Sequence, residues 1–396
     1  MQINNKYTHR TGTAKVHIPD SAGKNVNVKM TRHKMLFGCA EFGTIPYLNG
    51  EMDEKSAAQA EKRMKHMTEI LNSVTLPFYW GRYEPVEGKP DTERTLKAAK
   101  WLHNERGMTV KGHPLCWHTV CAPWLMEYSN AEIMKKQLER ITRDVGGFKG
   151  AIDMWDVINE AVIMPLFDRY DNAITRICKE RGRINLIRDL FKQAREANPE
   201  AILLINDFET SESYDILVEG LLEAGIKIDV IGIQSHMHQG YWGVEKTHRI
   251  LERFSRFNLP IHFTENTIVS GRIMPRGIED LNDFQPDEWP STPDGLIRQA
   301  EETVLHYETL FAHPLIESIT WWSFTDGGWL KAPGGLLDMN NDPKPVYNEL
   351  HKRIKGEWWT PEQTLTADEN GYVTVSGFKG DYAAVCNGNE TKFSIS

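Results

Sequence analysis

The chain has 396 residues, of which 40% are hydrophobic and 26% charged, and its formal net charge is -9. This length suffices for one large domain with a small accessory piece, and the composition is not that of a disordered chain. The acidic balance argues against a nucleic-acid partner, and no stretch approaches the ~20 apolar residues of a membrane span. We therefore expect a protein that acts on a neutral substrate, without nucleic acid or membrane.

Residues 1–34 form the first segment, with strand-like patterns at 13–18 and 25–30. The stretch that follows Met1, Gln2 to Arg10, is polar and lacks the apolar core of a secretory signal. We expect a secreted, extracellular protein if a signal was removed, and a cytoplasmic one if Met1 is native.

From residue 35 to 355, short apolar runs alternate with longer helical patterns. The predicted strands are 35–41, 73–78, 109–113, 152–158, 202–206, 230–234, 261–265 and 318–324. The predicted helices are 54–71, 92–104, 131–145, 185–197, 213–224, 244–257, 293–311 and 345–354. Strands that are each followed by a helix predict a (β/α)8 TIM barrel over residues 35–356, with the active site at the carboxyl ends of the strands.

Two polar segments remain. Residues 269–292 show little periodicity and follow the predicted strand that ends in Glu265, and a loop of this length is more often functional than idle. Residues 357–396 alternate in the strand period at 372–375 and 382–385. Small hairpins are marginal alone, so we expect 1–34 and 357–396 to pair into one accessory β module. We expect this module to support the barrel structurally, in preference to binding sugar through Trp358, Trp359 or Tyr372.

Two glutamates lie at the predicted ends of apolar strands. Asn159 and Glu160 follow the run Trp155-Asp156-Val157-Ile158, and Glu265 ends a second run. Glycosidic bond hydrolysis uses two carboxyl groups, placed roughly 5–5.5 Å apart in retaining enzymes. One such glutamate alone is equally well explained by a structural salt bridge, whereas the pair favours catalysis. His236 is a possible partner for Glu265.

Histidines and tryptophans lie near these glutamates in the predicted barrel. His113 and Trp117 follow the third strand, and Gln234 and His236 follow the sixth. The pair His236 and His238 could suggest a metal site, but no third ligand has a compelling spacing, so we expect neither metal nor other cofactor. Trp117, Trp322 and Trp329 offer flat faces for sugar rings, although a single tryptophan is usually a core residue. The odd set of five cysteines favours buried thiols over a Cys116 to Cys121 disulfide.

Together these motifs resemble glycoside hydrolase family 10, the endo-β-1,4-xylanases, over about residues 35 to 355. The matched motifs are H-x-L-x-W-H at 113–118, W-D-V-x-N-E-A at 155–161, I-N-D at 205–207, I-G-x-Q-S-H at 231–236, T-E at 264–265 and W-x-x-T-D at 322–326.

The resemblance implies roles for named residues. Glu160 would be the acid/base and Glu265 the nucleophile. Asn159, Gln234 and His236 would position the reacting sugar, and its subsite would be lined by His113, Trp117, Trp322 and Trp329. The substrate would be xylan or xylooligosaccharides, the products would keep the β configuration, and we expect a monomer.

The chain departs from the family pattern mainly on the glycone side. Leu76, Tyr79 and Val120 stand where the family has Asn, Lys and commonly Gln. We expect weaker binding there, or binding rebuilt from aromatic residues such as Phe78 and Tyr79.

Other departures lie near His236 and just after the fifth strand. Thr267 replaces the Asp that supports His236 in the family, so we expect His236 to lose its hydrogen-bond acceptor. Phe208 and Glu209 replace a Tyr and an Asn. The departures leave two alternatives to a xylanase, a retaining β-glycanase of other specificity and a carbohydrate-binding protein with little turnover.

Overall fold

The computed structural model of the protein describes residues 5–396. Within these residues eight parallel strands close into a barrel in the order β10-β3-β4-β5-β6-β7-β8-β9, which confirms the predicted TIM barrel. The barrel strands are β3 (Leu36–Ala40), β4 (Ser73–Pro77), β5 (Thr109–His113), β6 (Met154–Asn159), β7 (Ile202–Asp207), β8 (Val230–Met237), β9 (Ile261–Ile268) and β10 (Ile316–Trp321).

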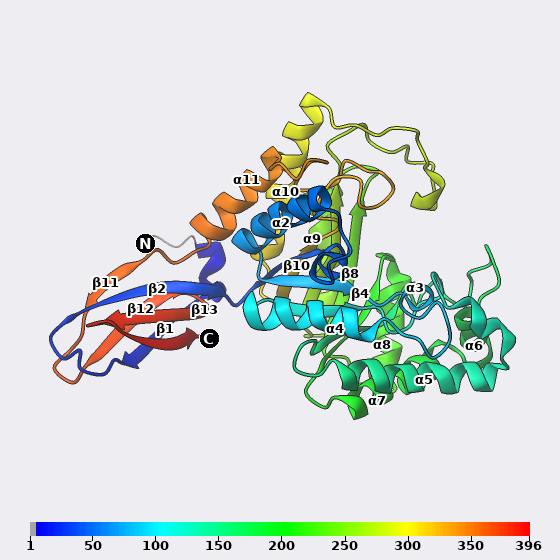
Figure 1. The fold of residues 1–396 in the computed structure, drawn as a ribbon, viewed down its shortest axis with the longest axis horizontal. Helices are drawn as coiled ribbons and strands as arrows, with labels where there is room; N and C mark the ends of the chain where they lie inside the picture. The colour runs from blue at the N-terminus through cyan, green and yellow to red at the C-terminus, as the bar shows by residue number, and fades with distance from the viewer. Residues whose placement is uncertain (1–4) are drawn as a thin grey trace.

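Helices surround this barrel (Figure 1). They are α1 (Thr44–Leu48), α2 (Glu54–Ile70), α3 (Trp80–Tyr83), α4 (Thr92–Lys100), α5 (Asn130–Gly147), α6 (Ala173–Arg181), α7 (Arg183–Ala197), α8 (Glu212–Glu223), α9 (Gly243–Ser255), α10 (Pro293–Phe311) and α11 (Pro345–Lys352). Short 3-10 turns cover Asn5–Arg10, Pro123–Glu127 and Leu281–Asp283, and π turns extend α4 and α11 at Trp101–Glu105 and Arg353–Glu357. None of the described helices is long and apolar enough to cross a membrane.

The sequence patterns missed the short helices, of which α6 is the clearest. It begins after Asn172, whose side chain accepts a hydrogen bond from the backbone N–H of Thr175 at 2.8 Å. Its nine residues are too few to show a strong helical period, so the cap and the packing define it.

Strands β8 and β9 continue beyond the predicted ends, and β10 stops earlier. Parallel pairing of β8 with β9 passes a register shift and then places Gln234 beside Glu265 and His236 beside Thr267. These side chains therefore lie within paired strands, which holds their backbone more firmly than a loop would. β10 ends at Trp321, so Trp322 is the first residue beyond it.

The N-terminal and C-terminal segments pair as predicted. β1 (Thr11–His17) pairs with β12 (Tyr372–Phe378), and β2 (Asn25–His33) lies between β11 (Gln363–Thr366) and β13 (Gly380–Cys386). An edge strand, β14 (Asn389–Ile395), completes the second sheet. β11 and β14 are polar and were not predicted. The module projects from the barrel at the left of Figure 1.

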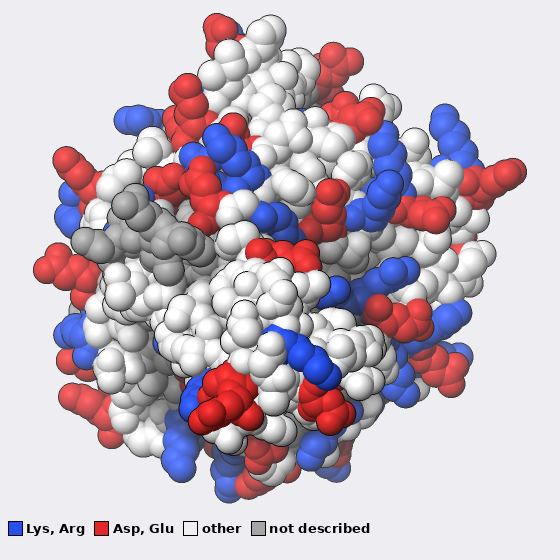
Figure 2. Space-filling view, turned by 90° about the vertical axis from the view of Figure 1, so that its left-hand side faces the viewer, with Lys and Arg blue, Asp and Glu red and all other residues white. Residues whose placement is uncertain are grey.

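Aromatic packing joins the module to the barrel. The ring of Trp358 is stacked on Phe311 with centroids 4.2 Å apart and lies 5.9 Å from Phe37. From the other segment, the Arg10 side chain donates to the backbone carbonyl of Phe311 at 3.0 Å. Figure 2 shows this end of the molecule, where acidic and basic side chains are interspersed. The five cysteines are free thiols.

Candidate active site

Glu160 directly follows β6 in an unusual backbone conformation. Its φ is +56°, in the left-handed region that non-glycine residues seldom adopt. Its backbone N–H donates to the Asn206 carbonyl at 2.8 Å, and its Oε2 accepts from the Trp117 indole at 2.8 Å. Such a strained position is maintained only by surrounding contacts and is common at functional sites. The half-buried carboxyl group is thereby directed at the barrel mouth.

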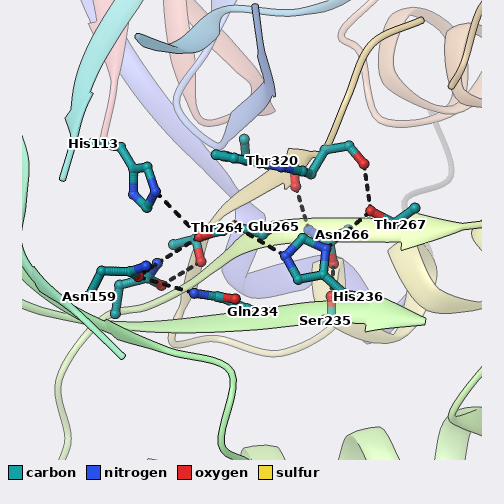
Figure 3. A network of polar contacts seen from close by, with 12 residues as sticks. His113, Asn159, Gln234, Ser235, His236, Thr264, Glu265, Asn266, Thr267 and Thr320 are labelled. Carbon is teal, nitrogen blue, oxygen red and sulfur yellow. Dashed lines mark hydrogen bonds and ion pairs between the residues drawn. The ribbon is translucent and has the colours of Figure 1, made fainter. Parts of the chain in front are cut away.

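Glu265 is buried within β9, where three side chains approach its carboxylate (Figure 3). His236 Nε2 lies 3.0 Å from Oε2, and Asn206 donates to Oε1 at 2.8 Å. His113 Nε2 is 4.0 Å from Oε1. The predicted partnership of Glu265 with His236 is thus present in the structure.

One hydrogen-bond network connects both carboxyl groups. The Asn206 amide donates to Glu265 and also to Asn159 Oδ1 at 2.8 Å. Gln234 donates to the same Asn159 oxygen at 3.1 Å and contacts Glu160 Oε1 at 3.4 Å. Thr264 donates to Asn206 Oδ1 at 2.6 Å, so both donors and the acceptor of this amide have partners. Asn206 is a site residue that the sequence reasoning did not select.

The two carboxyl groups differ in their acidity. Burial raises the pKa of Glu160 to about 8, against the Trp117 hydrogen bond, and the charges of Asp207 and Glu265 add to the rise. Burial acts in the same direction on Glu265, but the His236 hydrogen bond, His113 and Lys111 outweigh it and bring its pKa below the usual value. At neutral pH one group therefore holds a proton while the other is ionised.

A buried charged group supports His113 from below. Asp156 Oδ2 lies 2.7 Å from His113 Nδ1 and 2.7 Å from Lys111 Nζ, and all three side chains are buried. Burial alone would raise the pKa of Asp156, but Lys111 and His113 lower it. The contact fixes the orientation of the His113 ring, whose other nitrogen faces Glu265. Lys111 and Asp156 are also site residues that the sequence reasoning did not select.

Among the described residues there is no group of three or more His, Cys, Asp and Glu side chains arranged to hold a metal ion. His238, the second histidine of the possible metal pair, is buried against Trp329 and Trp289 at ring distances of 5.2 and 6.1 Å.

Comparison with known proteins places this site in a family. Residues 42–353 match the sequence model of Glycosyl hydrolase family 10. The chain belongs to glycosyl hydrolase family 10.

Relatives within family 10 are named xylanases. Endo-1,4-beta-xylanase B of Thermotoga neapolitana is 30% identical over 76% of this chain and 85% of its own length. Endo-1,4-beta-xylanase of Geobacillus stearothermophilus is 26% identical over 73% of this chain and 90% of its own length. Xylanase 10B of Thermotoga petrophila, solved with xylobiose, aligns at a TM-score of 0.66 and 25% identity over 81% of this chain and 95% of the other. The predictions of family membership and of a glycoside hydrolase are confirmed.

The structure resolves what Thr267 does in place of the family 10 Asp. Its hydroxyl donates to the backbone carbonyl of Trp322 at 2.5 Å, and its oxygen lies 3.3 Å from His236 Nδ1. The expectation that His236 loses its acceptor is therefore wrong in part, because the neutral hydroxyl oxygen of Thr267 lies where it can accept in place of a carboxylate. Thr267 also links β9 to the residue that follows β10.

Tyr79, one of the departures from the family pattern, belongs to an aromatic wall, which we define as Phe42, Tyr79, His113 and Trp322. Tyr79 lies 5.9 Å from Phe42 and 5.6 Å from His113 between ring centroids, and Trp322 lies 5.9 and 5.3 Å from the same two rings. Each ring thus contacts two others in a closed cycle. Trp117 lies outside this cycle, 5.5 Å from Tyr79.

Phe78 and Leu76 lie in the core of the barrel. Phe78, proposed as a replacement sugar contact, is fully buried and packs against Trp155 at 4.8 Å, so this expectation is wrong. Phe78 directly follows β4, and its side chain faces the core. Leu76 is also fully buried.

Trp329 and Phe208 lie on other parts of the active face. Trp329 packs 4.6 Å from His236. Phe208, in the place of a family Tyr, has 45% of its surface exposed directly after β7. Val120 lies in the loop after β5 with φ +48°, and its carbonyl accepts from Gly81 N–H at 2.8 Å.

Proposed function

We propose that the protein hydrolyses internal β-1,4-xylosidic bonds of xylan or xylooligosaccharides with retention of configuration. Glu265 is the nucleophile and Glu160 the acid/base in this proposal. The observation that carries it is the opposite displacement of the two pKa values within one hydrogen-bond network. The naming of the relatives as endo-1,4-beta-xylanases supports the choice of substrate.

In the first step, ionised Glu265 attacks the anomeric carbon while Glu160 transfers its proton to the departing glycosidic oxygen. A covalent glycosyl-enzyme ester forms and the leaving sugar departs as an alcohol. In the second step, Glu160, now a carboxylate, accepts a proton from water as the water oxygen attacks the same carbon and releases Glu265. Before the reaction Glu160 is neutral and Glu265 is negatively charged, which matches their roles in the first step.

The surrounding residues orient these groups. Asn206 and His236 each contact one oxygen of Glu265, which fixes the plane of the carboxylate. Asn159 and Gln234 lie between the two glutamates, where their amides are available to a sugar hydroxyl. Trp117 donates to Glu160 and so holds the acid at the barrel mouth. Trp322 and Trp329 supply apolar faces beside His236.

The aromatic wall gives the proposed enzyme an altered glycone side. A family Lys would donate hydrogen bonds to sugar hydroxyls, whereas Tyr79 offers one hydroxyl and a ring face. Leu76 is apolar and fully buried. We propose that recognition there depends on ring contacts more than on charge, which weakens discrimination among glycones.

The decisive experiment is azide rescue of Glu265→Ala. This variant should lose nearly all turnover while keeping its fold, and azide should restore cleavage of an activated aryl β-xyloside. Attack of azide from the face that Glu265 vacates gives an α-glycosyl azide, identified by NMR. A β-glycosyl azide would reverse the assignment of the two glutamates.

A second candidate is a retaining β-glycanase of other specificity, favoured by Leu76 and Tyr79. Rates on xylan and on mixed-linkage glucan, measured side by side, separate the two. Tight oligosaccharide binding with no hydrolysis at any pH would indicate a binding protein instead.

Three further properties are part of the proposal. Residues 35–356 form the catalytic barrel, and residues 1–34 and 357–396 form one supporting module. The enzyme is a monomer, which size-exclusion chromatography with light scattering tests. Action on polymeric xylan requires export, whereas action on short oligosaccharides is compatible with the cytoplasm.

A further inference from the structure

An ordered loop follows β9, the strand that carries Glu265. Residues 269–292 form a small core of their own with the segment after β10, in which Val269, Met274 and Trp289 are buried with Leu330 and Ala332. The Trp289 indole donates to the Arg272 carbonyl at 2.8 Å. The segment is therefore a packed loop with a defined shape.

This loop extends over the end of β8. The backbone N–H of Met274 donates to the His238 carbonyl at 3.0 Å. The side-chain amide of Gln239 donates to the carbonyls of Pro275 and Ile278 at 3.0 and 2.7 Å. These bonds hold the outer part of the loop above the residues that follow His236.

The tip of the loop meets the segment that follows Glu160. Arg169 donates from its two terminal nitrogens to the two carboxylate oxygens of Asp283, at 2.9 and 2.7 Å, and lies 3.2 Å from Asp280. We call these three residues the clasp. The segment that carries Arg169 is held in place, since the ring of Phe167 packs 4.6 Å from that of His118. In Figure 1 the two loops approach each other at the right of the barrel.

The position of the clasp follows from the strand order. One loop leaves β6 and the other leaves β9, and β7 and β8 lie between these strands in the barrel. The connection therefore crosses the carboxyl ends of β7 and β8, on the side of the glutamate pair opposite the aromatic wall. The rings of that wall end β5 or follow β3, β4 and β10.

We propose that the clasp of Arg169, Asp280 and Asp283 forms a bridge over the β7 and β8 side of the active face and discriminates polymeric from short substrates. The inference rests on the proposed glycosidase function and refines its substrate class. A long glycan can occupy the space between Glu160 and Glu265 and continue past β7 and β8, where it meets this bridge. Such a chain binds only if it passes beneath the bridge or if the bridge opens. A small aryl glycoside does not reach it.

The clasp is suited to opening. Arg169 and Asp283 have 45% and 57% of their side-chain surface exposed, so water and salt compete with the pair. The bidentate geometry favours one closed arrangement, while the exposure keeps the closed arrangement weak. Separation of the loops at this contact leaves the Gln239 bonds and the Trp289 core in place.

The test is the ratio of kcat/KM on soluble xylan to kcat/KM on a small aryl β-xyloside. Arg169→Gln removes both ion pairs. We expect this ratio to rise about two- to fivefold, the range that the exposed bidentate pair with Asp283 would set by itself. Raising the salt concentration toward ~1 M should raise the wild-type ratio and leave that of the variant unchanged. The matched control is Arg256→Gln, which likewise removes two ion pairs, here with Glu219 and Asp215 of α8.

An unchanged ratio in Arg169→Gln, or an equal fall on both substrates, would overturn the proposal, the second result showing that the pair only supports the Glu160 loop. Amide hydrogen exchange provides a readout that needs no activity. Residues 278–284 should exchange faster in Arg169→Gln than in Arg256→Gln, and equal exchange would also overturn the clasp. If the wild type cleaves no xylan, the proposed substrate fails, and the same ratio on the β-glycan and aryl glycoside that it does cleave tests the clasp.

Discussion

The proton held by Glu160 sets the expected pH dependence. With a pKa of about 8, Glu160 is protonated at neutral pH and loses its proton as the pH rises through that value. We expect kcat/KM on xylooligosaccharides to fall above pH ~8, because the leaving sugar then lacks an acid. Below neutral pH the rate should hold until Glu265 takes up a proton, below the usual glutamate pKa.

The variant Glu160→Ala provides the control for this fall in kcat/KM at high pH, the basic limb of the pH profile. An activated aryl xyloside needs no proton, so the variant should retain its first chemical step and show no fall near pH 8. A fall of the same size in the variant would assign the basic limb to another group.

Asp207 tunes Glu160 through charge. It is fully buried, which raises its pKa to about 7 although the backbone N–H groups of Val162 and Glu209 bind its carboxylate at 3.0 Å. Asp207→Asn removes negative charge beside Glu160, so the pKa of Glu160 should fall and the basic limb should move to lower pH. The pH profile of kcat/KM measures the shift.

Asp153→Asn is the matched control for this prediction. Asp153 accepts from Gly150 N–H and Asn198 at the opposite end of β6, roughly 20 Å from Glu160 by the rise of the strand. An equal displacement of the limb in both variants would mean that net charge, rather than the position of Asp207, is responsible.

At the scale of elements, β5 and β6 depend on one glycine. A Cβ on Gly112 would lie 2.2 Å from the indole of Trp155, which is fully buried in β6. We expect Gly112→Ala to lower the free energy of unfolding by about 1–3 kcal/mol, the usual cost of overpacking a core. Urea denaturation measures it.

The control is Gly147→Ala at the end of α5, where no atom beyond its chain neighbours and the backbone of its own helix lies within 4 Å of the added carbon. This substitution should leave stability unchanged or raise it by up to about 1 kcal/mol, since Ala is the better helix former. Equal destabilisation of the two variants would contradict the role assigned to the Trp155 contact.

The elements differ in how far the sequence reveals them. The barrel strands are predictable because helices cover their outer face, so each is a run of apolar residues. β11 and β14 have one exposed face and few apolar residues, and only pairing with β2 and β13 makes them strands. The true ends of β8 and β9 depend on a register shift between them that no local pattern encodes.

The site was predictable only in part, because local apolar runs are visible in the sequence and contacts between distant residues are not. Glu160 and Glu265 follow recognisable apolar runs, whereas Asn206 acts through partners far along the chain, Asn159 and Glu265. A polar residue within an otherwise apolar strand was the available signal, and Asp156 and Asn206 both carry it. The sequence alone does not say which of them would contact one of the two glutamates.

At the scale of the whole molecule, Trp358 joins the module to the barrel. It is fully buried against Phe37 and Phe311. Trp358→Ala should lower the free energy of unfolding by about 3–5 kcal/mol, as for other large core truncations. Thermal and urea unfolding, followed by tryptophan fluorescence, measure the change.

Trp359→Ala is the neighbouring control. Trp359 is half-buried, with Lys355 lying 4.2 Å from its ring, so its loss should cost much less. A Trp358→Ala variant as stable as Trp359→Ala would show that the module and the barrel are energetically independent.

The pairing of distant segments also determines when the module can exist during synthesis. β2 leaves the ribosome more than three hundred residues before its two neighbours, β11 and β13. Until they arrive, both edges of β2 stay open, a state that invites pairing with other chains. The alternating charged and polar side chains of β2, among them Lys29 and Arg32, are suited to this interval, because charges on an open edge oppose such pairing. An incomplete translation product therefore retains an unpaired β2, which marks it as unfinished to any factor that binds exposed strands.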